Sequence, residues 1–183
     1  MATLACQVAE RRGADVLRWM IGAARLDPAI YDELEREYSA TVPALLVVAL
    51  ASLASGVALL PAVGLIGIYT RAATAFISWT LFVVIAYLIG AKALPGPETS
   101  ATIGELVRTL GFAQTPVLLL ALGGVFPPVL VVLGPLVFVW VLLATIVALR
   151  EALDLTTART LVVAAISWLG FILLNLMLVP TLG

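Results

Sequence analysis

Residues 42–60 read VPALLVVALASLASGVALL, and none of these side chains carries a charge. A helix of about 20 apolar residues is long enough to cross the ~30 Å hydrocarbon core of a membrane. The absence of charge extends beyond this stretch as far as Tyr69. These residues therefore predict a transmembrane helix.

Four further apolar runs follow along the chain. The five predicted spans cover residues 42–60, 72–91, 106–122, 129–149 and 160–180. The chain of 183 residues is 63% hydrophobic and 11% charged, whereas soluble domains have about 45–50% apolar and ~25% charged residues. We therefore expect an all-α polytopic integral membrane protein. A five-transmembrane-helix bundle would occupy residues 41–183, after a cytoplasmic amphipathic helical segment at residues 1–40.

The basic residues are divided unequally between the two sides that these spans define. Nine of the ten Lys and Arg residues fall on one side: Arg11, Arg12, Arg18, Arg25, Arg36, Lys92, Arg108, Arg150 and Arg159. Arg71 alone falls on the other side. Since Lys and Arg accumulate in cytoplasmic loops, we expect a multi-pass protein of the cytoplasmic (inner) membrane. Its N-terminus would lie in the cytoplasm and its C-terminus outside.

The N-terminal segment shows the helical period. The apolar face predicted for its first helix consists of Val16, Leu17, Met20, Ile21 and Ala24. Asp27 and Pro28 predict the N-cap and first position of a second helix, with Ile30, Leu34 and Tyr38 along one face. The first helix would lie either in the bilayer interface or against the protein's own cytoplasmic face. The acidic residues of the second helix form either a solvated face or a docking surface for a partner.

The connections between the spans contain local signals. Residues 61–71 are apolar and rich in glycine, so they form either a tight external turn or a helix that continues close to the membrane. Thr102 and Glu105 form a capping-box pattern, which predicts a helix start. Pro116 lies inside the third predicted span and should kink it, because proline removes one backbone hydrogen bond. The carbonyl near Phe112 would then lack its usual donor and be free to bind another helix, a water or a ligand.

Charged residues gather at the predicted inner boundary of the third, fourth and fifth spans. This inner charged cluster consists of Glu105, Arg108, Arg150, Glu151, Asp154 and Arg159. Opposite charges there can pair in partly dry surroundings and fix the helix ends; a cytoplasmic recognition patch or a proton-linked gate is the functional alternative. Its carboxylates are candidate ligands for a divalent ion, but the neighbouring arginines argue against a metal site.

The spans contain two amides, Gln114 and Asn175, whose groups need partners in hydrocarbon. Interhelical hydrogen bonds are one role, worth about 0.6–2 kcal/mol each, and the lining of a substrate path is the other. The chain has no His and one cysteine, Cys6. No catalytic motif, cofactor fingerprint or basic stripe for nucleic acid is present, so we expect a non-enzymatic protein without cofactor or metal.

The stretch Gly111-Phe112-Ala113-Gln114-Thr115-Pro116 resembles the glycine–aromatic–small–x–x–Pro signature of the Yip family, the Rab-interacting membrane proteins with a Yip domain. Five spans with a cytoplasmic N-terminus are similar to that family, and so is the short loop Arg150–Asp154 between the fourth and fifth spans. Residues 26–34 resemble the acidic, Pro-containing segment before its first span. The resemblance covers about residues 41–179, and the Arg-rich composition is typical of a bacterial member.

The resemblance implies a membrane protein without catalytic activity. Eukaryotic members act in vesicle trafficking and bind prenylated GTPases, a role that we do not extend to a bacterial chain. We expect a protein that organises or scaffolds partners or lipids at the cytoplasmic membrane. Its partners would be membrane lipids, a protein at the cytoplasmic face and further copies in a homo-oligomer. The alternative is a small transporter or channel, with the kinked third span lining a path that includes Gln114 and Asn175. The candidate site for a ligand or a helix contact is Gly111–Pro116.

Overall fold

The computed structural model describes residues 2–95 and 101–182; the side chains of residues 2–11, 174, 175 and 177–182 lie outside the description. The described elements are helical. They are α1 (Ala2–Ala24), α2 (Pro28–Arg36), η1 (Tyr38–Ala40), α3 (Thr41–Ala58), α4 (Leu60–Tyr87), the π-helical η2 (Leu88–Ala93), α5 (Ile103–Phe112), η3 (Thr115–Gly124), η4 (Pro127–Val129), α6 (Leu130–Leu153) and α7 (Thr157–Leu182).

Both helix starts that the sequence predicted are confirmed. Asp27 accepts a hydrogen bond from the backbone N–H of Ala29 at 3.0 Å, and α2 begins at Pro28. Thr102 and Glu105 form the reciprocal capping box at the start of α5. Each of these signals depends on residues within four positions, so the surrounding fold does not alter it.

The predicted apolar faces of α1 and α2 are partly buried in the bundle. Among the described residues of α1, Trp19, Gly22 and Ala23 are buried. From the predicted face of α1, Val16 and Met20 are partly buried against the core, whereas Leu17 and Ile21 are 59% and 52% exposed. On α2 the buried set is Ile30, Tyr31 and Leu34, whereas Tyr38 is 79% exposed. The helix α2 ends at Arg36 and the chain turns into η1, so Tyr38 no longer follows the helical period of α2.

Apolar helices of membrane length follow. Among the described residues, three helical stretches are long and apolar enough to cross a membrane: Tyr38–Ala58, Leu60–Ala93 and Pro127–Leu153. The pair α5 and η3, bent by 45°, passes the same test together and is either a broken fourth span or a re-entrant loop. The described apolar part of α7, Thr157–Leu173, is shorter and occupies the position of the fifth predicted span. The chain is therefore a polytopic, all-helical membrane protein.

The second span is longer than the predicted 72–91, because residues 61–71 continue the helix. Of the two alternatives for this segment, the helical one is correct. The helix is kinked at Gly64, whose φ of 66° lies in the left-handed region that glycine adopts without strain. Residues before the kink are apolar on all sides, and hydrophobic periodicity therefore gave no sign of where this helix begins.

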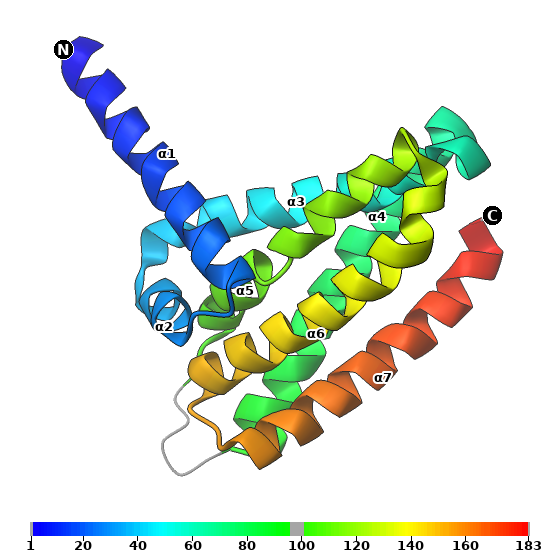
Figure 1. The fold of residues 1–183 in the computed structure, drawn as a ribbon. Helices are drawn as coiled ribbons and strands as arrows, with labels where there is room; N and C mark the ends of the chain where they lie inside the picture. Colours follow the sequence, from blue (N-terminus) through cyan, green and yellow to red (C-terminus); the bar gives the residue numbers. More distant parts are fainter. Residues whose placement is uncertain (1, 96–100, 183) are drawn as a thin grey trace.

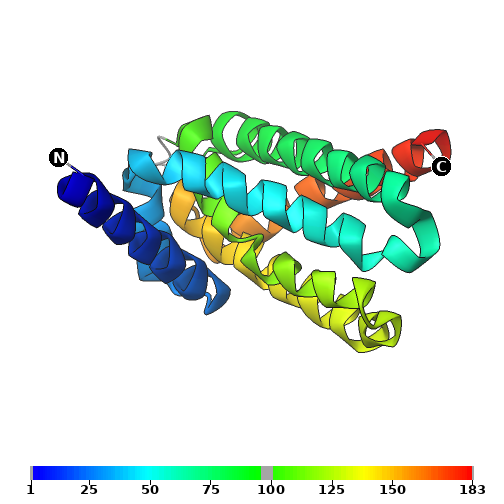
Figure 2. The ribbon, with the colours of Figure 1, turned by 90° about the horizontal axis from the view of Figure 1, so that it is seen from above.

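The helices form one elongated bundle. The helix α3 packs against α4, α5 and η3, while α6 packs against η3 and α5, and α7 against α4 (Figures 1 and 2). The helix α2 lies across one end of the bundle, and the first part of α1 projects away from it (Figure 1). Figure 2 shows α1 and the last turn of α7 at opposite ends of the bundle. We call the end with α2 the α2 end.

Candidate functional site

The third span is broken at Ala113 and Gln114, and its two halves meet at an angle of 45°. Pro116 stands in the first turn of η3, where its missing N–H removes no hydrogen bond from that helix. The predicted kink is present, but the predicted free carbonyl is not. The hydroxyl of Thr115 donates to the carbonyl oxygen of Phe112 at 2.7 Å, so the chain itself supplies the donor.

Gly111 lies where α5 meets α3. A Cβ atom at this position would be 2.9 Å from the Cβ of Ala44 and 3.2 Å from its carbonyl oxygen. Side-chain carbon atoms do not approach that closely, so this contact requires glycine. The close approach of a neighbouring helix that we expected at Gly111 is thus made by α3.

Phe112 faces the N-terminal helices. Its side chain is fully buried, and its ring makes an edge contact with Trp19 of α1 at a centroid distance of 5.8 Å. Edge contacts of this kind contribute about 0.5–1.5 kcal/mol beyond area burial. Gly111 and Phe112 therefore join α5 to α3 and α1.

Arg108 holds the end of α2. Its side chain is 2% exposed, and its Nε donates to the carbonyl oxygen of Leu34 at 2.8 Å. A second guanidinium nitrogen donates to the carbonyl of Glu35, and the guanidinium lies 4.9 Å from the ring centroid of Tyr38. The last carbonyls of a helix carry partial negative charge and lack intrahelical donors. The buried guanidinium of Arg108 supplies both the positive charge and the hydrogen-bond donors that the end of α2 lacks.

The rest of the inner charged cluster is dispersed. Arg150 and Glu151 form an ion pair at 2.6 Å, and Arg159 donates to the carbonyl of Pro95 at 3.1 Å. Glu105 is used in the capping box, and Asp154 ends α6 in the left-handed conformation at φ 48°. In the part of the chain that the structure describes, no three carboxylate, cysteine or histidine side chains are placed to hold a metal ion.

The carboxylate of Glu35, the residue whose carbonyl accepts from Arg108, has a shifted pKa. Burial is the main cause and the negative charges of Asp154 and Glu105 act in the same direction, so that its pKa is raised to about 7. By contrast, the hydrogen bond from Arg18 lowers the pKa of Glu33, which also accepts a hydrogen bond from Trp19 at 2.9 Å. The pKa values of Glu33 and Glu35 are thus shifted in opposite directions from the ordinary value.

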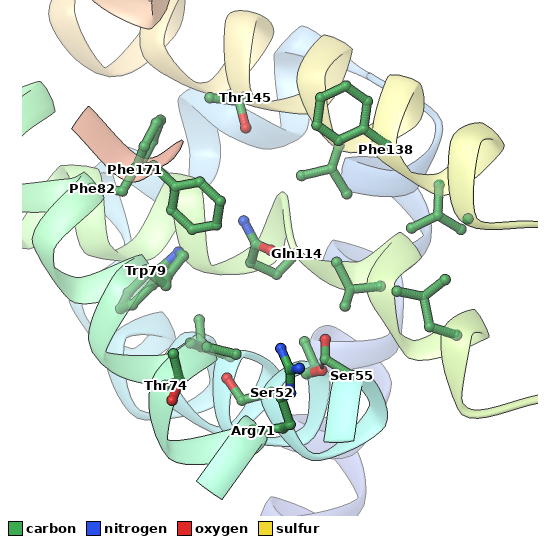
Figure 3. A pocket seen from close by; sticks show the side chains of 18 of the residues that line it. Ser52, Ser55, Arg71, Thr74, Trp79, Phe82, Gln114, Phe138, Thr145 and Phe171 are labelled. Atoms are coloured by element: carbon green, nitrogen blue, oxygen red, sulfur yellow. Dashed lines mark hydrogen bonds between the residues drawn. The ribbon is translucent and has the colours of Figure 1, made fainter. Parts of the chain in front are cut away.

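A partly open cavity of about 430 Å³ lies between α3, α4, η3, α6 and α7. Its polar lining consists of Ser52, Ser55, Arg71, Thr74, Gln114 and Thr145. Its aromatic lining consists of Trp79, Phe82, Phe138, Trp168 and Phe171. Figure 3 shows Gln114 pointing into this space, with Arg71 and Ser55 together on the wall opposite Phe138. The volume is within the ~300–1,000 Å³ typical of small-molecule sites.

The cavity extends from the middle of the bundle toward the end remote from α2. Its lining runs from Val48, in the middle of α3, to Leu59, and on α6 from Gly134 to Thr145. Sequence reasoning placed Gln114 at a site but missed the other walls. The available signal was Arg71, the one basic residue outside the predicted cytoplasmic side.

Asn175 belongs to α7, but its side chain lies outside the described part of the structure. The structure therefore gives no contact for this amide. Of the predicted site residues, Gly111, Phe112 and Arg108 meet at the junction with α1–α3, Gln114 lines the cavity, and Pro116 starts η3.

Comparison with known families agrees with the resemblance in the sequence. The family model of the Yip1 domain matches residues 26–179. Searches against curated proteins and against solved structures gave no match. The matched range begins just before α2 and includes every helix from α2 to nearly the end of α7, and so covers most of the chain. This chain is a member of the Yip1 domain family.

Proposed function

We propose that this chain is a non-enzymatic protein of the cytoplasmic membrane that organises protein partners, with its N-terminal helices as the cytoplasmic docking surface. Membership of a family whose proteins are generally non-enzymatic supports the first part. The inner charged cluster and the N-terminal arginines lie at the α2 end, whereas Arg71 lies in the opposite half. This division supports a cytoplasmic N-terminus and an external C-terminus.

One observation supports the docking role: α1 is fixed to the bundle and yet leaves apolar side chains uncovered. The indole N–H of Trp140 donates to the carbonyl oxygen of Ala24 at 2.7 Å, and Arg18 pairs with Glu33 of α2. Leu17 and Ile21, one turn apart on α1, remain more than half exposed. A rigid helix with an exposed apolar stripe is a form that partner helices and grooves recognise.

Site-specific photo-crosslinking tests this proposal. A photoreactive amino acid at Ile21 should yield an adduct with a second protein in intact cells, whereas the same group at Asp15, on the opposite face of α1, should not. The double variant Leu17→Ser/Ile21→Ser should reduce the co-purified partner at least fivefold, and Arg12→Ala/Asp15→Ala should leave it unchanged. Adducts with lipid only, or equal protein adducts at both positions, would contradict a docking role for this face.

A homo-oligomer is the second part of the proposal, and it rests on the sequence. Native mass spectrometry of the purified chain in detergent should give a mass of two or more protomers. The mass of a single protomer at high protein concentration would contradict the homo-oligomer but not the docking role of α1.

A transporter or channel is the second candidate, and the cavity beside the broken third span is the observation that favours it. Gln114→Leu would remove the amide from that cavity. Solute flux through liposomes containing the protein, reduced by this substitution, would support transport; no flux in either protein would exclude it for the solutes tested.

A further inference from the structure

We infer that the cavity between α3, α4, η3, α6 and α7 binds a single-chain amphiphile with a phosphate head, the head on Arg71 and the chain along the aromatic wall. This site opens toward the end of the bundle remote from α2. The inference goes beyond the proposed docking function and is independent of it.

Among the described side chains, Arg71 has no carboxylate partner. The sequence contains no Asp or Glu between Glu37 and Glu98, between Glu105 and Glu151, or after Asp154. These three gaps include every residue that lines the cavity. Among the described side chains, none forms an ion pair or hydrogen bond with the half-buried Arg71. An arginine in a membrane protein is costly unless it is paired, and no described side chain supplies the anion, so we infer an anionic ligand.

The depth of Arg71 matches that of a lipid head group. Lys92 follows Arg71 by 21 residues along α4 and η2, which corresponds to about 30 Å of helix. That length equals the thickness of the hydrocarbon core. With Lys92 at one boundary of the membrane, Arg71 therefore lies at the other, and a phosphate at that boundary can meet the guanidinium in bidentate geometry.

The remaining lining suits an acyl chain. Below Arg71 along α4 come Trp79 and Phe82, and Trp168 and Phe171 continue the wall from α7. Figure 3 shows the rings of Trp79 and Phe171 on the side of the cavity toward Phe82, with Ser52, Ser55 and Arg71 gathered at the polar side. A polar rim beside an apolar, aromatic interior is the arrangement expected for a molecule with one polar and one apolar end.

A buried donor on the same wall also lacks an acceptor. The indole Nε1 of Trp168 is enclosed and has no hydrogen-bond partner among the described residues. Buried polar groups are almost always paired in folded proteins. An ester or phosphate oxygen is an acceptor that such an amphiphile would bring into the cavity.

Tryptophan quenching measures this binding directly, because Trp79 and Trp168 line the cavity. The full chain in mild detergent is titrated with three probes: a lysophosphatidic acid with a brominated chain, a monoacylglycerol with the same brominated chain, and inorganic phosphate as competitor. Bromine quenches tryptophan at short range. We expect the phosphate-bearing amphiphile to bind at least tenfold more tightly than the neutral one, and free phosphate at equal concentration not to displace it.

Substitutions at two cavity positions, Arg71 and Gly134, separate recognition of the phosphate head from recognition of the acyl chain. Arg71→Gln should abolish the preference for the phosphate head, while Arg71→Lys should retain part of it and Arg12→Gln, on exposed α1, all of it. Gly134 lines the cavity in open space, with no atom within 4 Å of a Cβ added there. Gly134→Leu should therefore weaken the binding of both amphiphiles at least tenfold. Gly13→Leu, on α1, where an added Cβ also meets no atom within 4 Å, should not.

Three results would overturn the inference. They are equal affinity for the charged and neutral amphiphiles, an unchanged head preference in Arg71→Gln, and displacement by free phosphate at equal concentration, which indicates an anion site only. Gel filtration of each variant verifies folding. If Arg71→Gln aggregates, Arg71→Lys replaces it, and a preference for the phosphate head equal to that of the wild type in Arg71→Lys would overturn the inference. Crosslinking at Ile21 tests the docking proposal separately, so the docking role and amphiphile binding can each fail without the other.

Discussion

The Nε of Arg108 donates to the carbonyl oxygen of Leu34 at 2.8 Å, across 74 positions of sequence. This contact fixes α2 across the end of the bundle. The sequence placed Arg108 in the inner charged cluster, whereas in the structure its guanidinium caps the last carbonyls of α2. The guanidinium is buried, so each hydrogen bond it makes is charge-assisted and worth about 1.5–3 kcal/mol.

Arg108→Leu should therefore release α2. We expect amide hydrogen exchange in residues 28–40 to accelerate at least tenfold, because two carbonyls at the end of α2 lose their donors. Arg108→Lys should restore only part of the protection, since lysine lacks the planar fork. Arg36→Gln is the matched control: its ion pair with Asp32 is exposed and contributes at most about 1 kcal/mol. Equal exchange in Arg108→Leu and Arg36→Gln would show that Arg108 does not hold α2.

Gly111→Ala should destabilise the protein by about 1–3 kcal/mol, because the added Cβ meets Ala44 of α3 at 2.9 Å and the backbone there cannot move aside freely. The same substitution at Gly134, which faces open space in α6, should be neutral or stabilise by up to about 1 kcal/mol. Thermal unfolding in detergent compares the two variants. A lower melting temperature for Gly134→Ala than for Gly111→Ala would refute the packing assignment.

Glu35 should give stability a pH dependence of defined sign. Its pKa of about 7 exceeds the ordinary 4.5, so the folded protein binds a proton that the unfolded chain releases between these values. Stability is then highest below pH 4.5, falls as the pH rises to 7, and is constant above. Glu35→Gln should remove this fall and be more stable than the wild type at pH 8, by roughly 1 kcal/mol after allowance for solvent screening.

Glu33→Gln is the control with the opposite sign. Arg18 lowers the pKa of Glu33, so its carboxylate stabilises the folded state at high pH and the amide should reduce stability at pH 8. Thermal unfolding between pH 4 and pH 8 measures both variants. If Glu35→Gln and Glu33→Gln shift the melting temperature in the same direction at pH 8, the opposite pKa shifts of the two carboxylates are contradicted.

Local signals in this sequence were sufficient where the interaction partners are close along the chain. Asp27 with Pro28, and Thr102 with Glu105, predicted helix starts correctly because a cap depends on the first turn alone. The apolar runs predicted the helices of the bundle for the same reason, since a membrane span needs only length and hydropathy.

The contacts of Arg108, Phe112 and Arg71 lay beyond such reasoning. Arg108 reaches α2 and Phe112 reaches Trp19 only after the chain has folded back, and no spacing rule links positions so far apart. The face of α1 that packs on the bundle could not be chosen from the sequence because Val16, Leu17 and Trp19 are all apolar, so that choice depends on the bundle. Arg71 was noticed as an isolated charge, but its cavity requires five elements to be assembled.

The alternating arrangement of the chain across the membrane is the central claim, and cysteine labelling in intact cells tests it. Cys6, the one cysteine, is first replaced by serine. Single cysteines are then introduced as Asp15→Cys, Tyr69→Cys, Leu94→Cys and Val125→Cys, at positions that are all exposed. A membrane-impermeant maleimide should label Tyr69→Cys and Val125→Cys in intact cells, but Asp15→Cys and Leu94→Cys only after permeabilisation. The reverse pattern, or Tyr69→Cys and Val125→Cys on different sides, would contradict the account.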